Sequence, residues 1–276
     1  MNYRLIADSS CELTDELISG LDAKSVPLRL TLGNKTYIDD QNLDVNEFLS
    51  DMKQYSGKTK SSCPAPFDFA NECKENTVNF IITLSSQLSG SYSSACMAKD
   101  IAKEEGKEVY VFDSKSASAG ETLIAIKIKE FIKNGFDVSQ IVKNTENFIS
   151  QMKTFFVLEN LDNLVKNGRM NKITGTLATV MNIRPILGSD ANGNIASYSK
   201  SRGSIQALEK LCGLIGKHAT STSDKTLVIT HCNNNEGAKT FEKLVEKFYK
   251  FKDIIILPTR GLSSMYANEG GIIIAF

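Results

Sequence analysis

The sequence predicts an α/β protein of two domains, the first built on a parallel, doubly wound sheet and the second of the α+β class. Short apolar runs rich in β-formers alternate with helical patterns through the first half of the chain, as in parallel sheets with helices on both faces. Two helical patterns then follow each other, at 121–133 and 138–152. The length of 276 residues is comfortable for two cores. We therefore expect domains at 1–152 and 153–276.

A strand, a turn and a helix start follow one another between residues 78 and 97. The apolar run Val78–Leu84 breaks into a Ser- and Gly-rich stretch and then into a helical pattern. The first N–H groups of a helix lack intrahelical partners and carry partial positive charge, which favours an anion. Ser89, Gly90 and Ser91 are therefore candidates for an anion site, and a simple helix cap made by the serines is the alternative.

Two further strands of this half end in similar turns. The strand 3–7 runs into Asp8–Ser10 and a helix expected at 11–21, and the strand 108–114 runs into a small-residue turn that ends at Gly120. Parallel strands place their carboxyl ends at one edge of the sheet, where ligands of such folds bind. The three turns are therefore expected to meet at that edge.

The elements between these strands follow from turn residues and prolines. Gly33-Asn34 predicts a hairpin or a strand with an edge extension, and a helix is expected at about 45–55. The segment 57–69, GKTKSSCPAPFDF, predicts a loop that opens a helix near Pro66, because proline suits a first helical turn.

The second half predicts an α+β unit. A hairpin is expected across Asn192-Gly193. One short helix is expected to end at Gly168, and three more are expected at 172–182, 204–218 and 236–250. Strands are expected at 154–160, 226–232, 253–259 and 271–276.

Composition narrows the function. The 32 basic and 32 acidic residues cancel, which argues against nucleic acid or an anionic membrane as a partner. The six cysteines form no CxxC pair, which indicates a reducing compartment and no metal site. The start of the chain shows no export signal, and no apolar run approaches the ~20 residues of a membrane span. We expect a cytoplasmic protein without membrane insertion.

Catalytic motifs are sparse. The chain has two histidines, His218 and His231, and neither shares a motif with a serine; no GxSxG, GxxxxGK[ST] or GxGxxG sequence occurs. The spacing of Asp, Glu, His and Cys does not favour a metal. A pocket for a small anionic molecule at the sheet edge is favoured, and a serine hydrolase is the weaker alternative.

Several segments together resemble a known family. IADSS, SSCPAPFDF, LSSQLSGSYSSA, FDSKSASAGE, LVKNGRMNKITGTLATVMNIRPIL and SRGSIQALEKL occur in the order and spacing of the DegV family of bacterial fatty-acid-binding proteins, over essentially the whole length. The resemblance implies a long-chain fatty acid bound between two α/β domains, with no other cofactor and no catalysis by the chain itself. Some members present the acid to a separate kinase subunit, which makes acyl phosphate with ATP.

The resemblance also implies ligand-binding residues. Ser61 stands where the family usually has the threonine of a Thr-Ser-x-Pro-Ser loop, and Ser62 matches the serine that follows it. Ser89 and Gly90 match a Ser-Gly turn, so Ser89 and the N–H groups of Gly90 and Ser91 would hold the other side of the carboxylate. These assignments coincide with the anion site expected from the residues themselves.

Two arginines are carried over in the same way. Arg169 matches the arginine of a Gly-Gly-Arg-Ile segment, and Arg202 matches an arginine near the end of the hairpin. Both are candidates for head-group or kinase contact, with a surface ion pair or a helix-end cation as the alternative. Apolar residues of the second half are candidates for the tail tunnel, with ordinary core as the alternative: Phe155, Phe156, Leu177, Met181 and Ile186.

The chain departs from the family near its C-terminus. The family commonly carries Thr-His-x-Gly-Pro-Gly where this chain has residues 265–270, so Tyr266 replaces the histidine. A tyrosine hydroxyl donates a hydrogen bond but carries no positive charge at neutral pH, and Glu269 adds a negative charge nearby. A binding protein for another amphiphile therefore stays open as an alternative to the fatty-acid carrier. An enzyme for a small anionic substrate at Ser61 and Ser89 is a separate alternative, from another class of function.

Overall fold

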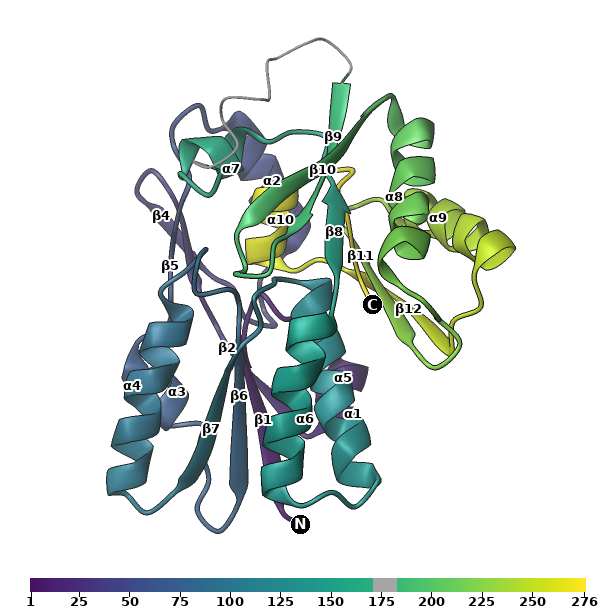
Figure 1. The fold of residues 1–276 in the computed structure, drawn as a ribbon. Helices are drawn as coiled ribbons and strands as arrows, with labels where there is room; N and C mark the ends of the chain where they lie inside the picture. The colour runs from purple at the N-terminus through teal and green to yellow at the C-terminus, as the bar shows by residue number, and fades with distance from the viewer. Residues whose placement is uncertain (171–182) are drawn as a thin grey trace.

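The computed structural model describes residues 1–170 and 183–276, whose strands form three sheets (Figure 1). The first sheet has the order β2-β1-β6-β7, and all its pairs are parallel. Its strands are β1 (Tyr3–Asp8), β2 (Ala23–Val26), β6 (Val78–Thr83) and β7 (Glu108–Asp113).

Helices cover both faces of this sheet, because successive residues of a strand point to opposite faces. Leu5 and Phe80 pack beneath α1 (Asp15–Leu21), α5 (Ala119–Lys133) and α6 (Val138–Gln151). Ile6 and Ile81 pack beneath α3 (Pro66–Ala70) and α4 (Ser91–Glu104) on the opposite face. The predicted doubly wound parallel sheet is confirmed.

The second sheet belongs to the C-terminal half and is mixed, with the order β10-β9-β8-β13-β11-β12. Its strands are β8 (Thr154–Val157), β9 (Ile183–Ser189), β10 (Ile195–Arg202), β11 (Thr226–His231), β12 (Asp253–Pro258) and β13 (Ile272–Ala275). The helices α8 (Ser204–His218) and α9 (Asn235–Phe248) cover one face. α5 lies against β11 and β13 on the other face and so separates the two large sheets. The α+β architecture of this half is confirmed.

A third, small sheet lies beside them, with the antiparallel order β4-β3-β5. Its strands are β3 (Arg29–Leu32), β4 (Lys35–Ile38) and β5 (Lys60–Ser62), and α2 (Val45–Gln54) packs on it. Two short helices complete the fold near this sheet, α7 (Asp162–Lys166) and α10 (Gly261–Ala267).

The structure corrects several predicted boundaries. The helix expected at 11–21 begins at Asp15, because Cys11 and Leu13 are buried and the Thr14 side chain caps the helix by accepting from the Leu17 N–H group. Ser61, expected in a loop, lies in β5. β2 and α10 were not predicted as separate elements.

Other predictions lie beyond what the structure addresses. The helix expected at 172–182 falls outside the described residues. The division into domains 1–152 and 153–276 stays a prediction. In the part of the chain that is described, no helix has both the length and the apolar character that crossing a bilayer demands.

Candidate functional site

A cavity of about 850 Å³, including its opening to solvent, lies between the two large sheets. The turns after β1, β6 and β7 contribute Ser10, Ser89 and Ser118, respectively, to its wall. The three strand-end turns of the parallel sheet therefore meet at one cavity, and β8, β9, β13 and α10 close it from the other side.

The side of the cavity formed by the mixed sheet is apolar because of strand alternation. Phe156 and Ile273 are paired across β8 and β13, and both point into the cavity. Their neighbours Phe155 and Ile272 point to the opposite face, into the core beneath α8 and α9. Of the predicted tail-lining residues, Phe156 lines the cavity and Phe155 and Ile186 belong to that core; Leu177 and Met181 lie outside the described residues.

Three serines of the wall, Ser116, Ser118 and Ser189, have hydroxyls that hydrogen-bond to other protein groups. The Ser116 and Thr154 hydroxyls lie 2.7 Å apart, and Ser118 donates to Glu12 at 2.7 Å. Ser189 donates to the carbonyl oxygen of Lys115 at 2.5 Å. This part of the wall is therefore compatible with an apolar ligand segment.

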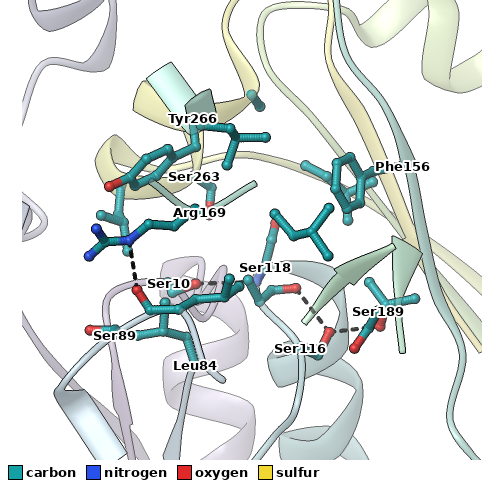
Figure 2. Close-up of a pocket in the computed structure, with 18 of the residues that line it drawn as sticks. Ser10, Leu84, Ser89, Ser116, Ser118, Phe156, Arg169, Ser189, Ser263 and Tyr266 are labelled. Carbon is teal, nitrogen blue, oxygen red and sulfur yellow. Dashed lines mark hydrogen bonds between the residues drawn. The ribbon is translucent and has the colours of Figure 1, made fainter. Parts of the chain in front are cut away.

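One end of the cavity gathers polar side chains from distant parts of the chain. In Figure 2, Ser89, Arg169 and Tyr266 lie at one end, while Ser116 and Ser189 lie at the other. The Ser61 and Tyr266 hydroxyls are 3.2 Å apart. We call Ser61, Ser89, Arg169 and Tyr266 the polar end of the cavity.

Local structure places each of these four side chains. Ser61 is carried by β5 opposite Leu30 of β3, and Tyr266 is carried by α10. Ser89 precedes α4, and its hydroxyl accepts from the Ser91 N–H group at 3.2 Å. Ser89 thus closes a turn just before α4, whose N-cap residue is Gly90 and which has no side-chain cap.

Arg169 supplies positive charge at the polar end. Its Nε donates to the Leu88 carbonyl oxygen at 3.0 Å, and Nη1 donates to the Asn167 carbonyl oxygen at 2.5 Å. Among the described residues, no carboxylate forms an ion pair with Arg169. Two backbone carbonyl oxygens therefore hold the Arg169 guanidinium near the cavity.

The other four candidate site residues do not belong to the described lining of the cavity. Ser62 and Gly90 are exposed, and Arg202 is exposed at the end of β10. Ser91 is fully buried, and both its hydroxyl and its N–H group lie 3.2 Å from the Ser89 hydroxyl. The Gly90 and Ser91 N–H groups are therefore poorly placed to bind a ligand inside this cavity.

A layer of buried carboxyl groups lies behind the serines, and sequence reasoning missed it. Asp8, Glu12, Asp39 and Glu121 are all 0–1% exposed. Burial raises the pKa of Asp8 to about 6 and that of Glu12 to about 7. Burial and the neighbouring Asp8 charge raise the pKa of Glu121 well above its usual value.

These carboxyls do not form a metal site. Within residues 1–170 and 183–276, no three His, Cys, Asp or Glu side chains are arranged to hold an ion. All six cysteines are free. The chemistry that the site offers is hydrogen bonding and positive charge at one end of an apolar space.

The fold and the site together define an α/β protein whose two large sheets hold an apolar cavity with one polar end. A family model described as "Uncharacterised protein, DegV family" matches residues 2–276. The chain belongs to the DegV family. A DegV domain-containing protein of Streptococcus gordonii is 32% identical over 280 residues, covering 100% of this chain and 99% of the relative.

Solved structures of the family are similar throughout. A DegV family protein from Ruminococcus gnavus, refined with vaccenic acid, is 38% identical with a TM-score of 0.94, and the match covers 99% of each chain. The fatty acid kinase (Fak) B3 protein of Streptococcus pneumoniae, loaded with linoleic acid, is 30% identical with a TM-score of 0.90. That match covers 100% of this chain and 99% of the relative.

Proposed function

We propose that this protein binds a long-chain fatty acid in the cavity and carries it without catalysing a reaction. The observation that carries the proposal is an apolar cavity whose one end collects hydroxyls and an arginine. Each buried methylene of an acyl chain contributes about 0.8 kcal/mol, so the tail can supply most of the affinity. The relatives refined with vaccenic and linoleic acids support this choice of ligand.

In this proposal the carboxylate lies at the polar end. Ser61, Ser89 and Tyr266 donate hydroxyl hydrogen bonds to it, and the Arg169 guanidinium adds a long-range attraction. A carboxylate accepts several hydrogen bonds at once, and bonds to a charged acceptor are the stronger ones. With tyrosine in place of the family's usual histidine, Arg169 is the positive group among the four residues.

The carrier role follows from the residues that are absent from the cavity wall. Neither histidine belongs to the described lining; His218 packs against Phe155, and His231 accepts from the Asn234 N–H group. The imidazole base that usually activates a serine nucleophile is therefore missing from the described lining, and the carboxyl beside Ser118, that of Glu12, also accepts from the Arg260 N–H group. This argument favours binding and presentation over hydrolysis.

We further propose that a separate kinase subunit is the partner of this protein. Arg202 is exposed and lies outside the cavity lining, so it suits contact with a partner better than contact with the head group. The partner would phosphorylate the carboxylate at the polar end in the cytoplasm. The relative named fatty acid kinase B3 motivates this partner.

Native mass spectrometry of the purified protein, followed by denaturing extraction, tests the proposal. A stoichiometric long-chain fatty acid in the extract is the expected result. A protein that emerges empty and also fails to bind added fatty acids would exclude this function and return the cavity to a search for another amphiphile.

A further inference from the structure

Asp39 lies immediately after β4, at the joint between the small sheet and α10, and it is fully buried. Its Oδ1 accepts from the Gly261 N–H group at 2.8 Å, and its Oδ2 accepts from the Leu262 N–H group at 2.8 Å. Oδ2 also accepts from the Ser9 hydroxyl at 2.8 Å. Both carboxyl oxygens are therefore occupied as acceptors.

These bonds give α10 a cap that its own sequence lacks. The first N–H groups of a helix need external acceptors, which a side chain at the helix start often provides. Arg260, at this position, makes no side-chain cap. Asp39 supplies the acceptors from 222 residues away, and Glu12 accepts from the Arg260 N–H group at 2.7 Å.

The small sheet carries Ser61 of the polar end, and α10 carries Tyr266. Ser61 in β5 and Asp39 after β4 both flank the central strand β3, where Leu30 pairs with Ser61. Asp39 holds the first turn of α10, and Tyr266, near the end of that helix, reaches back to Ser61. Asp39 therefore connects the small sheet, which carries Ser61, to the helix that carries Tyr266.

The approach of α10 to the sheet is close enough to require glycine. A Cβ atom built on Gly261 would lie 2.5 Å from Asp39 Oδ1 and would also collide with Leu43. Such a distance forces a shift of the backbone or of the carboxyl. The position of the helix is therefore fixed at its start, two residues before Ser263 enters the cavity wall.

We propose that Asp39 is a positioning residue for the ligand site: by capping α10 it holds the Tyr266 hydroxyl against Ser61 and so determines how strongly the polar end binds a carboxylate. This inference rests on the proposed function for its binding consequence. Its structural consequence, the placement of Tyr266, is independent of any ligand.

Asp39→Asn tests the cap with little change of shape. An asparagine replaces one acceptor oxygen by an amide N–H group, which cannot accept from a backbone N–H group, so one donor of α10 loses its partner. Asp40→Asn is the matched control. The Asp40 side chain accepts from the Asn42 N–H group at 2.8 Å, a bond that an asparagine oxygen can keep.

A second pair of variants tests the contact between Asp39 and α10 by a change in the helix. Gly261→Ala should displace the start of α10 by the collision with Asp39. Gly213→Ala is its control, because Gly213 also lies in a helix and a Cβ atom there has no neighbour within 4 Å. This pair decides the question if Asp39→Asn does not fold.

The first readout needs no ligand. The protein is labelled with 3-fluorotyrosine, and the ¹⁹F resonance of Tyr266 is assigned by its loss in Tyr266→Phe. We expect this resonance to move in Asp39→Asn and in Gly261→Ala, and to stay in place in both controls. An unmoved resonance in the two folded test variants would overturn the inference even if the protein binds no fatty acid.

The second readout is the affinity for oleic acid. Asp39→Asn should weaken binding about three- to tenfold, the range of one or two imperfect hydrogen bonds. In a Tyr266→Phe background the same change should have less than about a twofold effect, because residues that act through one another are non-additive. An equal loss in both backgrounds would overturn the inference, whereas a wild type that binds no oleic acid would reject the proposed function alone.

Discussion

The hydroxyl of Ser61 lies 3.2 Å from the hydroxyl of Tyr266, although 205 residues separate them in the chain. The pair brings β5 and α10 together at the polar end of the cavity. Both groups are neutral donors and acceptors, so the pair can hydrogen-bond a carboxylate without attracting it from a distance. The long-range attraction then depends on Arg169.

Tyr266→Phe should weaken fatty-acid binding about two- to tenfold, because one hydrogen bond contributes about 0.5–1.5 kcal/mol. Isothermal titration calorimetry measures the change. Tyr110→Phe is the control, since the Tyr110 hydroxyl donates to Glu108 at the end of β7 remote from the cavity. Equal affinities of Tyr266→Phe and the wild type would remove the phenol from the head-group site.

Tyr266→His should restore a charge that depends on pH. An imidazole with an ordinary pKa of about 6.5 is largely protonated at pH ~6 and neutral at pH ~8. We expect the histidine variant to bind the carboxylate several-fold more tightly than the wild type at the lower pH and about equally at the higher pH. The ratio of the two affinities, measured at both pH values, cancels the titration of the ligand itself. A ratio that is independent of pH would contradict the prediction.

Ser61→Ala combined with Ser89→Ala should weaken binding about 5- to 100-fold through the loss of two hydroxyl donors. Neither serine is fully buried, so the folded state should persist, which thermal unfolding monitored by circular dichroism can verify. Ser62→Ala with Ser93→Ala is the matched control, because these neighbouring serines are exposed and lie outside the cavity lining. Similar losses in the two double variants would argue against the assignment.

Ala117→Leu should shorten or narrow the cavity, because Ala117 lines it from the turn before α5. Affinity should fall more for longer acids than for shorter ones in a series of saturated fatty acids, since about 0.8 kcal/mol is lost for each methylene that no longer fits. Ala191→Leu, in the exposed turn between β9 and β10, controls for added apolar surface. A uniform loss across the series would mean that Ala117 does not border the tail.

Glu12 should make the protein less stable as the pH rises toward neutrality. The pKa of Glu12 is about 7 in the folded chain, and its ordinary value, which applies to the unfolded chain, is 4.5. Between pH 4.5 and 7 the folded state therefore binds more protons than the unfolded state. The free energy of unfolding therefore falls with rising pH in that interval, by roughly 3 kcal/mol for such a shift.

Urea unfolding at several pH values between about 4.5 and 7.5 measures this slope. Glu12→Gln should flatten it, and Glu104→Gln, a change at an exposed helix position, should leave it as in the wild type. The buried Asp8, whose pKa is raised to about 6, retains part of the slope in every variant. An unchanged slope in Glu12→Gln would show that Glu12 contributes no proton uptake on folding.

Much of the fold could be predicted because its signals are local. Alternating apolar runs and helical patterns identified the parallel sheet, and turn residues placed the hairpins at Gly33-Asn34 and Asn192-Gly193. Three polar turns could be assigned to one edge of the sheet, since parallel strands end on the same side. Ser10, Ser89 and Ser118 do meet at the cavity.

The remaining features depend on contacts between distant residues. α10 could not be predicted, because its cap is Asp39 rather than a residue at its own start. Glu12 occupies a polar position before α1 that is typical of a surface, and only the packing of α5 and α10 against it makes it buried. The partner of a serine hydroxyl likewise depends on distant residues, as the bond from Ser118 to Glu12 shows.

The cavity between the two sheets occupies space that side chains would otherwise fill in a protein of this size. If the proposed ligand fills it, the acyl chain becomes part of the hydrophobic core, and the folded state is stabilised by an amount that grows with ligand concentration. The empty protein would then open and be degraded faster than the loaded one. Lipid supply in the cell would set not only how much of this carrier is occupied but also how long each copy survives.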